Sequence, residues 1–228
     1  MLGQNHLVEI KPDTFHGLLN LSDLDMPLNR ITAVPANAFQ TLSALKTLNL
    51  AFNTISKIST RSFIGLSQLH LLNLEQNKLK SLPVRVFKPL IKLEVIVLDS
   101  NLLKTVNAAV FEGLSNLQQL YMRNNHIERL PQDVFKNTPR LMQLALSGNK
   151  LKYIDGNILS HLPAIKDVFL HNNPWACDCN MKSFIHWLSQ TKANVFPFED
   201  LRCNFPAENK DKAIHTLMEK DFKCKARS

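Results

Sequence analysis

The sequence lacks the features that mark membrane-spanning proteins and most enzymes. It has no low-complexity tract and no apolar run near the roughly 20 residues of a membrane-spanning helix. No basic start followed by an apolar stretch marks a signal peptide within this chain. There is no H-E-x-x-H pair, G-x-S-x-G elbow or phosphate loop, and the eight histidines are dispersed. Asp167 and His171 approach each other on one predicted strand, but no nucleophile accompanies them. We therefore predict a non-enzymatic protein that needs no cofactor or metal.

A regular asparagine spacing dominates the rest of the chain. Asparagine recurs every 24 residues, at positions 5, 29, 53, 77, 101, 125, 149 and 173. Each of these asparagines ends a segment that matches the frame L-x-x-L-x-L-x-x-N fully or nearly, and the full match is seen from Leu45 to Asn53 and from Leu69 to Asn77. This period and frame resemble those of leucine-rich repeat proteins. The resemblance implies an α/β solenoid, a horseshoe with a parallel concave β-sheet in which each repeat gives one short strand and one returning segment.

The repeat positions also predict the core. Within each strand the apolar residues alternate, as at Leu48 and Leu50, so both should point inward. A second apolar pair per repeat should fill the middle of the coil: Ile31 and Val34, Ile55 and Ile58, Leu79 and Leu82, Leu103 and Val106, Ile127 and Leu130, Leu151 and Ile154. A stacked column should line the far wall: Phe15, Phe39, Phe63, Phe87, Phe111, Phe135 and then Leu159. The repeated asparagines lie among these apolar residues, so their amides should hydrogen-bond the backbone of adjacent turns.

The two ends of the chain differ. Leu2 and Asn5 already occupy strand and ladder positions, so we expect an N-terminal cap and a secretion signal to precede this chain in the natural protein. At the other end the period stops at Asn173. We predict repeats over residues 1–172 and a C-terminal cap over residues 173–228.

All four cysteines lie in the predicted cap: Cys177, Cys179, Cys203 and Cys224. An even number clustered at one end suggests disulfides in an oxidising compartment. A zinc site is the other reading, but the cysteines lack the paired short spacings of structural zinc sites.

The cap sequence itself carries a second resemblance. The stretch from Asn173 to Cys179, with Trp187 and Arg202 ahead of Cys203, resembles the cysteine-rich C-terminal cap of extracellular leucine-rich repeat proteins. That resemblance implies the pairs Cys177–Cys203 and Cys179–Cys224. Helical spacing predicts a cap helix from Met181 to Gln190 that packs through Phe184, Ile185 and Leu188. Within the superfamily, the simple 24-residue repeats and the cap resemble those of leucine-rich alpha-2-glycoprotein or of an immune receptor ectodomain of the Toll-like or variable lymphocyte receptor type, and no motif decides between these alternatives.

The exposed strand positions form the candidate binding face. Leu71, Val95, Val97 and Tyr121 would lie on three consecutive strands and make one apolar patch. Its rim and its extension comprise Asn73, Glu75, Asp99, Gln119, Arg123 and Phe169. An apolar centre with a polar rim, a tyrosine and an arginine is typical of a protein-binding hot spot. Scattered surface valines and leucines without a role are the alternative.

The charge distribution suggests a second surface. The net charge is +8, but the charged residues at the predicted concave positions are mainly acidic, which argues against nucleic acid as a partner. Basic residues gather instead on the returning segments, at Lys78, Lys80, Arg85, Lys88 and Lys92. This basic flank could bind a glycosaminoglycan. Asn20 begins the single N-x-S/T sequon and is the predicted glycosylation site.

The sequence therefore predicts an extracellular module, secreted or part of a receptor ectodomain. It would bind a protein ligand in innate immunity, signalling or adhesion. A glycosaminoglycan-binding or matrix-organising protein is the alternative function.

Overall fold

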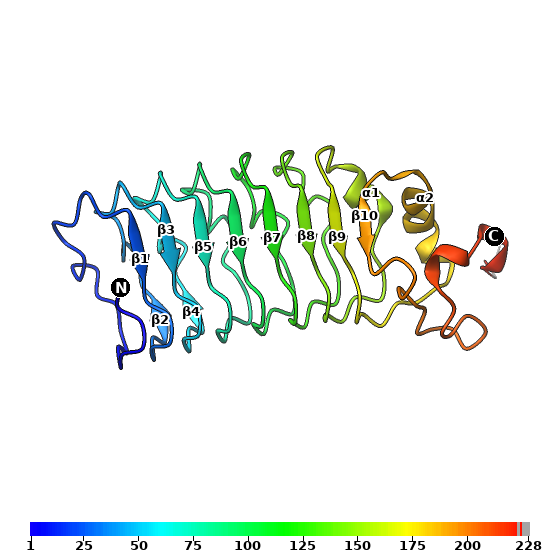
Figure 1. Cartoon of the computed structure of the whole chain (residues 1–228), viewed down its shortest axis with the longest axis horizontal. Coiled ribbons are helices and arrows are strands. Elements are labelled where there is room, and N and C mark those ends of the chain that lie inside the picture. The colour runs from blue at the N-terminus through cyan, green and yellow to red at the C-terminus, as the bar shows by residue number, and fades with distance from the viewer. Residues whose placement is uncertain (223, 225–228) are drawn as a thin grey trace.

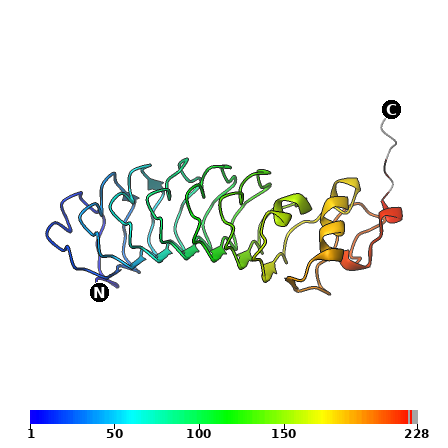
Figure 2. The same cartoon turned by 90° about the horizontal axis from the view of Figure 1, so that it is seen from above.

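The chain folds into similar turns that are stacked one after another along the long axis of the molecule, shown from the side in Figure 1 and from above in Figure 2. The structure is a computed structural model that describes residues 1–222 and 224. One strand from each turn joins an eight-stranded parallel sheet, in the order β1-β3-β5-β6-β7-β8-β9-β10. Its strands are β1 (Asp23–Asp25), β3 (Thr47–Asn49), β5 (Leu71–Asn73), β6 (Val95–Val97), β7 (Gln119–Tyr121), β8 (Gln143–Ala145), β9 (Asp167–Phe169) and β10 (Asn194–Phe196). The predicted solenoid is confirmed, and we call the exposed side of this sheet the concave face.

The returning segments contain little regular structure. In the first two repeats they pair as β2 (Ala33–Val34) and β4 (Lys57–Ile58), and in the last repeat they include helix α1 (Gly156–Ser160). Between these elements the chain returns mainly through turns. The tight return is visible at Gly65, whose φ is +94° and where an added Cβ would lie 2.3 Å from the carbonyl oxygen of Gln40. Only glycine fits that position without displacement.

The core follows the repeat frame. Strand residues such as Leu48, Leu50, Leu72 and Leu74 are fully buried. The phenylalanines stack in two runs, with centroid distances of 5.7 Å for Phe15–Phe39 in the first run and of 5.8 Å for Phe63–Phe87, 6.4 Å for Phe87–Phe111 and 6.3 Å for Phe111–Phe135 in the second. Leu159 is buried at the same phase. Leu82 and Leu130, predicted to fill the middle of the coil, are only partly buried against this core.

The asparagine ladder joins each turn to the one before it. Asn125 is a representative rung: its Oδ1 accepts from the N–H of Leu103 at 3.0 Å, and its Nδ2 donates to the carbonyl of Leu98 at 3.0 Å. The same pattern holds at Asn29, Asn53, Asn77, Asn101, Asn149 and Asn173. Asn5 differs, because it is exposed and donates only to Leu2 and Gly3 in its own turn. The predicted role of the ladder is confirmed for every rung after the first.

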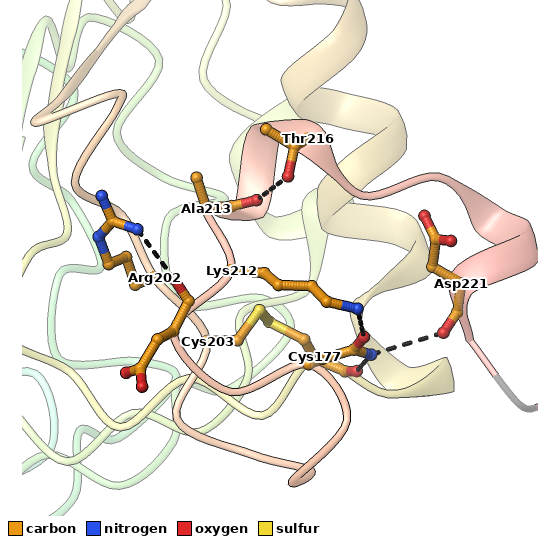
Figure 3. The surroundings of a disulfide bond; sticks show 9 residues. Cys177, Arg202, Cys203, Lys212, Ala213, Thr216 and Asp221 are labelled. Carbon is orange, nitrogen blue, oxygen red and sulfur yellow. Dashed lines mark hydrogen bonds between the residues drawn. A yellow bond between two sulfur atoms is a disulfide. The ribbon is translucent and has the colours of Figure 1, made fainter.

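Two disulfides hold the C-terminal end together, with the pairing that the resemblance implied. Cys177 is bonded to Cys203, and Cys179 to Cys224. Figure 3 shows the surroundings of the first bridge. Beside it the buried Asn209 donates to the carbonyl of Cys177 at 3.0 Å and accepts from Lys212 Nζ at 3.0 Å.

The cap helix begins one residue later than predicted. Helix α2 spans Lys182–Gln190, after a 3₁₀ turn over Cys179–Met181, and two further 3₁₀ turns follow at Ile214–Thr216 and Glu219–Asp221. Phe184 and Trp187 are buried, while Ile185 and Leu188 are partly buried against the same core. The division at residue 173 stays a prediction, since the sheet continues past it into β10. Residues 223 and 225–228 of the predicted cap lie outside the described part.

Candidate functional site

The strand register fixes the order of side chains on the concave face. Its second row, formed by the last residue of each strand, runs Asp25, Asn49, Asn73, Val97, Tyr121, Ala145, Phe169, Phe196. From Val97 onward every member is apolar or aromatic, and we call this part the apolar row. Four strand spacings of about 4.8 Å give it a length of about 19 Å. Leu71 and Val95 lie beside its start in the neighbouring row, which continues to Gln119. The structure therefore brings the predicted patch residues together.

Tyr121 lies at the centre of this surface and is held by its neighbours. Its hydroxyl lies within hydrogen-bonding distance of the side-chain oxygens of Gln119, at 2.9 Å, and of Gln143. The Arg123 guanidinium carbon lies 5.2 Å from the centroid of the Tyr121 ring. Burial raises the pKa of the Tyr121 hydroxyl, so it is neutral at physiological pH. A ring fixed on two sides loses little further entropy when a ligand covers it.

The Arg123 side chain is held by Asp99 and is not fully available to a ligand. Asp99 accepts from the Arg123 backbone N–H at 2.6 Å and from Nε at 2.8 Å, and Nη2 lies 2.7 Å from the same carboxylate. The hydrogen bond to Asp99 raises the pKa of the Arg123 guanidinium, which therefore keeps its charge. Asp99 itself is only 4% exposed. The pair is fixed in place, and Arg123 offers a ligand only its remaining N–H groups.

Asn73 and Glu75, two other predicted rim residues, are partly exposed and joined by a hydrogen bond. Asn73 Oδ1 accepts from the backbone N–H of Glu75 at 2.9 Å, which orders the end of β5. Both residues are partly exposed on the concave side. Glu75 thus remains a charged group at the edge of the apolar patch.

Phe196 is the residue on this face that the repeat pattern missed. It lies on β10, beyond the last ladder asparagine, and its ring stacks on Phe169 with centroids 5.0 Å apart. Phe196 is 41% exposed. The signal in the sequence is weak but present, because Asn194-Val195-Phe196 repeats the pattern of Asp167-Val168-Phe169 outside the 24-residue period.

The basic flank is partly neutralised. Glu112 accepts from Arg85 Nε at 2.6 Å and from Lys88 Nζ at 3.0 Å, and these bonds lower the pKa of the Glu112 carboxyl. Lys92 donates to Gln68 at 2.7 Å. Lys78 and Lys80 are exposed. The flank therefore carries less free positive charge than its sequence suggests.

The remaining predicted features concern other parts of the surface. Asn20 is exposed in the turn before β1, where a glycan could be attached. Among residues 1–222 and 224, none of the helices has the length and apolar character needed to cross a bilayer. The same residues contain no group of three or more His, Cys, Asp or Glu side chains suited to a metal ion.

Comparison with known proteins agrees with this architecture. The leucine rich repeat family profile matches residues 20–79, 68–127 and 122–174. Trophoblast glycoprotein of Macaca fascicularis is 40% identical over 57 residues, which is 25% of this chain and 13% of the relative. Leucine-rich glioma-inactivated protein 1 of Bos taurus is 44% identical over 52 residues, which is 23% of this chain and 9% of the relative. These matches thus span less than a seventh of each relative's length.

A solved structure extends the similarity to nearly the whole chain. The crystal structure of human trophoblast glycoprotein, also called Wnt-activated inhibitory factor 1, superimposes with a TM-score of 0.81 at 28% identity. The match covers 98% of this chain and 86% of that one. The repeated frame, the asparagine ladder, the parallel sheet and the profile matches lead to one conclusion: the chain belongs to the leucine-rich repeat family.

Proposed function

We propose that this chain is an extracellular module that binds a protein ligand through its concave face, with the apolar row as the centre of the contact. The observation that carries the proposal is the row itself. Val97, Tyr121, Ala145, Phe169 and Phe196 are aligned on five consecutive strands of the sheet. Ala145 is fully buried, and the other four side chains are at least partly exposed. Aligned apolar and aromatic side chains with a polar rim form the usual core of a protein–protein interface.

The solenoid does not require apolar residues in this row. In the first three strands the same position holds Asp25, Asn49 and Asn73, and the backbone register there is unchanged. The buried core is formed mainly by other positions of the frame, such as Leu48 and Leu50, and Ala145 is the one member of the row that is fully buried. The change from polar to apolar side chains between β5 and β6 therefore supports a role outside the fold.

Three observations support an extracellular location. Disulfides such as the two in the cap persist in oxidising compartments. The relatives include a protein named as a glycoprotein, and Asn20 offers an exposed sequon here. Of the settings expected from the sequence, the second name of the structural relative, Wnt-activated inhibitory factor 1, favours signalling over immunity or adhesion.

A glycosaminoglycan on the basic flank is the weaker candidate. The single carboxylate of Glu112 offsets part of the charge of Arg85 and Lys88, so within the part of the chain that the structure describes Lys78, Lys80 and Lys92 are the cations of the set without an anionic partner. Binding of a polyanion depends on the number of free cations that it can neutralise. We therefore keep the concave face as the primary site.

The test is a screen of secreted proteins and receptor ectodomains, displayed singly, for binding to the full chain. Val97→Asp places a charge in the apolar row, and Val84→Asp makes the same change at a residue that is 48% exposed on a returning segment. A ligand of the proposed kind should bind the wild type and the Val84→Asp variant alike. Tyr121→Ala should weaken it by about 1 to 4 kcal/mol, which corresponds to about 5-fold to 1000-fold in Kd.

Two results would reject the concave site. One is a ligand whose affinity is the same for Val97→Asp, Tyr121→Ala and the wild type. The other is a ligand lost on charge reversal of Lys78 and Lys80 with a steep dependence on salt, which would favour the basic flank.

A further inference from the structure

The loop that follows each concave strand contains one residue in the left-handed conformation. This column runs Gln4, Leu28, Phe52, Gln76, Ser100, Asn124, Gly148 and Asn172, with φ between 52° and 69°. Glycine and asparagine tolerate this conformation, whereas leucine and phenylalanine are disfavoured there because Cβ approaches the backbone. The fold requires the conformation in every turn but does not require a large apolar side chain.

Leu28 and Phe52 are the exceptions, and they are neighbours. Leu28 donates its backbone N–H to Ala51, the residue before Phe52, at 3.2 Å. Leu28 is 49% exposed and Phe52 is 41% exposed, although both side chains are large and apolar. Two adjacent turns thus combine an unfavourable backbone conformation with an unfavourable exposure. Such local costs persist where a function depends on the side chains.

Both side chains line a hollow of about 460 Å³. It lies beside the N-terminal turns, whose ribbon forms the blue end of the chain in Figure 1. Its other lining residues are Gln4, Asn5, His6, Asn29 and Arg30. The lining contains a guanidinium and an imidazole but no carboxylate. Arg30 is exposed and has no ion-pair partner among the residues that the structure describes. The hollow therefore combines apolar surface with an unpaired positive charge.

We propose that this hollow is a second binding site, separate from the concave face, for a protein segment that carries a large apolar side chain next to an aspartate or glutamate. The apolar side chain would lie between Leu28 and Phe52. The carboxylate would reach Arg30, which can bind it through two parallel N–H groups. An anionic membrane surface has similar chemistry, but binding to anionic lipids relies on clusters of roughly four to eight Lys or Arg side chains, and the lining of this hollow contains one guanidinium.

The probe is a phage-displayed library of random 12-residue peptides selected on the full chain. Peptides that also bind the double variant Leu28→Asn/Phe52→Asn are removed. This variant should keep the fold, because Asn124 and Asn172 occupy the same column in other turns; its circular dichroism and melting temperature verify this. The selected peptides should share an aromatic or large aliphatic residue next to Asp or Glu. Their synthetic forms should bind at least tenfold more weakly to the double variant and severalfold more weakly to Arg30→Gln.

The control variant is Tyr121→Ala, which should change the affinity of these peptides by less than twofold and so separates this site from the concave face. The proposal is overturned if no peptide is enriched, if the enriched peptides lack acidic residues, or if Arg30→Gln has no effect. It is also overturned if the chain sediments with phosphatidylserine vesicles through Leu28 and Phe52 while no peptide depends on them.

Discussion

Replacing Asn125 by alanine tests whether the asparagine ladder stabilises the solenoid. The Asn125 side chain is 3% exposed and makes four hydrogen bonds to backbone groups: it accepts from Leu103 and donates to Leu98, Met122 and Arg123. Alanine leaves the buried N–H of Leu103 without its partner, which costs roughly 1 to 3 kcal/mol. The carbonyls of Leu98 and Met122 keep a second donor, from Asn101 and Asn149 respectively, so their loss is smaller. We expect a total of about 2 to 4 kcal/mol.

Asn5→Ala is the matched control. Asn5 belongs to the same ladder but is exposed and bonds only to its own turn, so its loss should cost at most about 0.5 kcal/mol. Asn125→Asp separates the two functions of the amide. A carboxylate can still accept from Leu103 but cannot donate to Leu98, and it places a charge in the core, so it should destabilise at pH 7 at least as much as alanine does.

The measurement is urea unfolding of the non-reduced protein, followed by circular dichroism. At a slope of about 2 to 3 kcal/mol per molar urea, the Asn125→Ala midpoint should fall by about 1 M. Equal midpoints for Asn125→Ala and Asn5→Ala would refute the reasoning, because the cross-turn bonds would then contribute nothing measurable.

Three further predictions concern the ends of the chain. Tyr153 donates to Asp178 Oδ2 at 2.7 Å, and this bond raises the pKa of the Tyr153 hydroxyl. Because the pKa is raised in the folded state, the bond's contribution to the free energy of unfolding is complete below the unfolded pKa of about 10 and is lost as pH rises through the folded pKa. At pH 7 the free energy of unfolding of the wild type should exceed that of Tyr153→Phe by about 1 kcal/mol. A difference between the two proteins that is unchanged at pH 11.5 would contradict this. Replacing Cys179 and Cys224 together by serine should cost about 2 to 5 kcal/mol and should raise hydrogen exchange first in α2, whereas uniform exchange along the solenoid would argue against a local role. Asn20→Gln should remove the one N-linked glycan added during secretion from a eukaryotic host, and mass spectrometry that finds a second occupied site would disprove the single-sequon assignment.

The repeat frame predicted the fold because the same contact recurs in every turn. A residue such as Asn125 has one environment, set by its position in the frame, and the alternation of Leu48 and Leu50 determines which side chains enter the core. The cap was predicted through its four cysteines, whose pairing the family resemblance supplied. In both cases a local pattern determines the structure.

The candidate site was less predictable because it depends on how side chains meet across turns. Asp99 and Arg123 occupy the same position in consecutive repeats, so their proximity could be read from the period, but their mutual hydrogen bonds could not. Strand β10 follows the end of the period, so the continuation of the apolar row to Phe196 appears only in the sheet register. The left-handed backbone conformation of Leu28 and Phe52 could not be predicted from the repeat frame for a similar reason, since it is a property of the folded loop.

The bridge between Cys179 and Cys224 also determines how the molecule carries mechanical load. Helix α2 and strand β10 both lie in the loop that this bridge closes, over a sequence separation of 45 residues. A force that pulls on the chain after Cys224 passes through the sulfur–sulfur bond to Cys179, a few residues beyond the ladder rung Asn173. The loop is bypassed and is not stretched. Tension on the C-terminal side would therefore leave β10, with Phe196 at the end of the concave face, in its register beside β9 for as long as the bridge is intact.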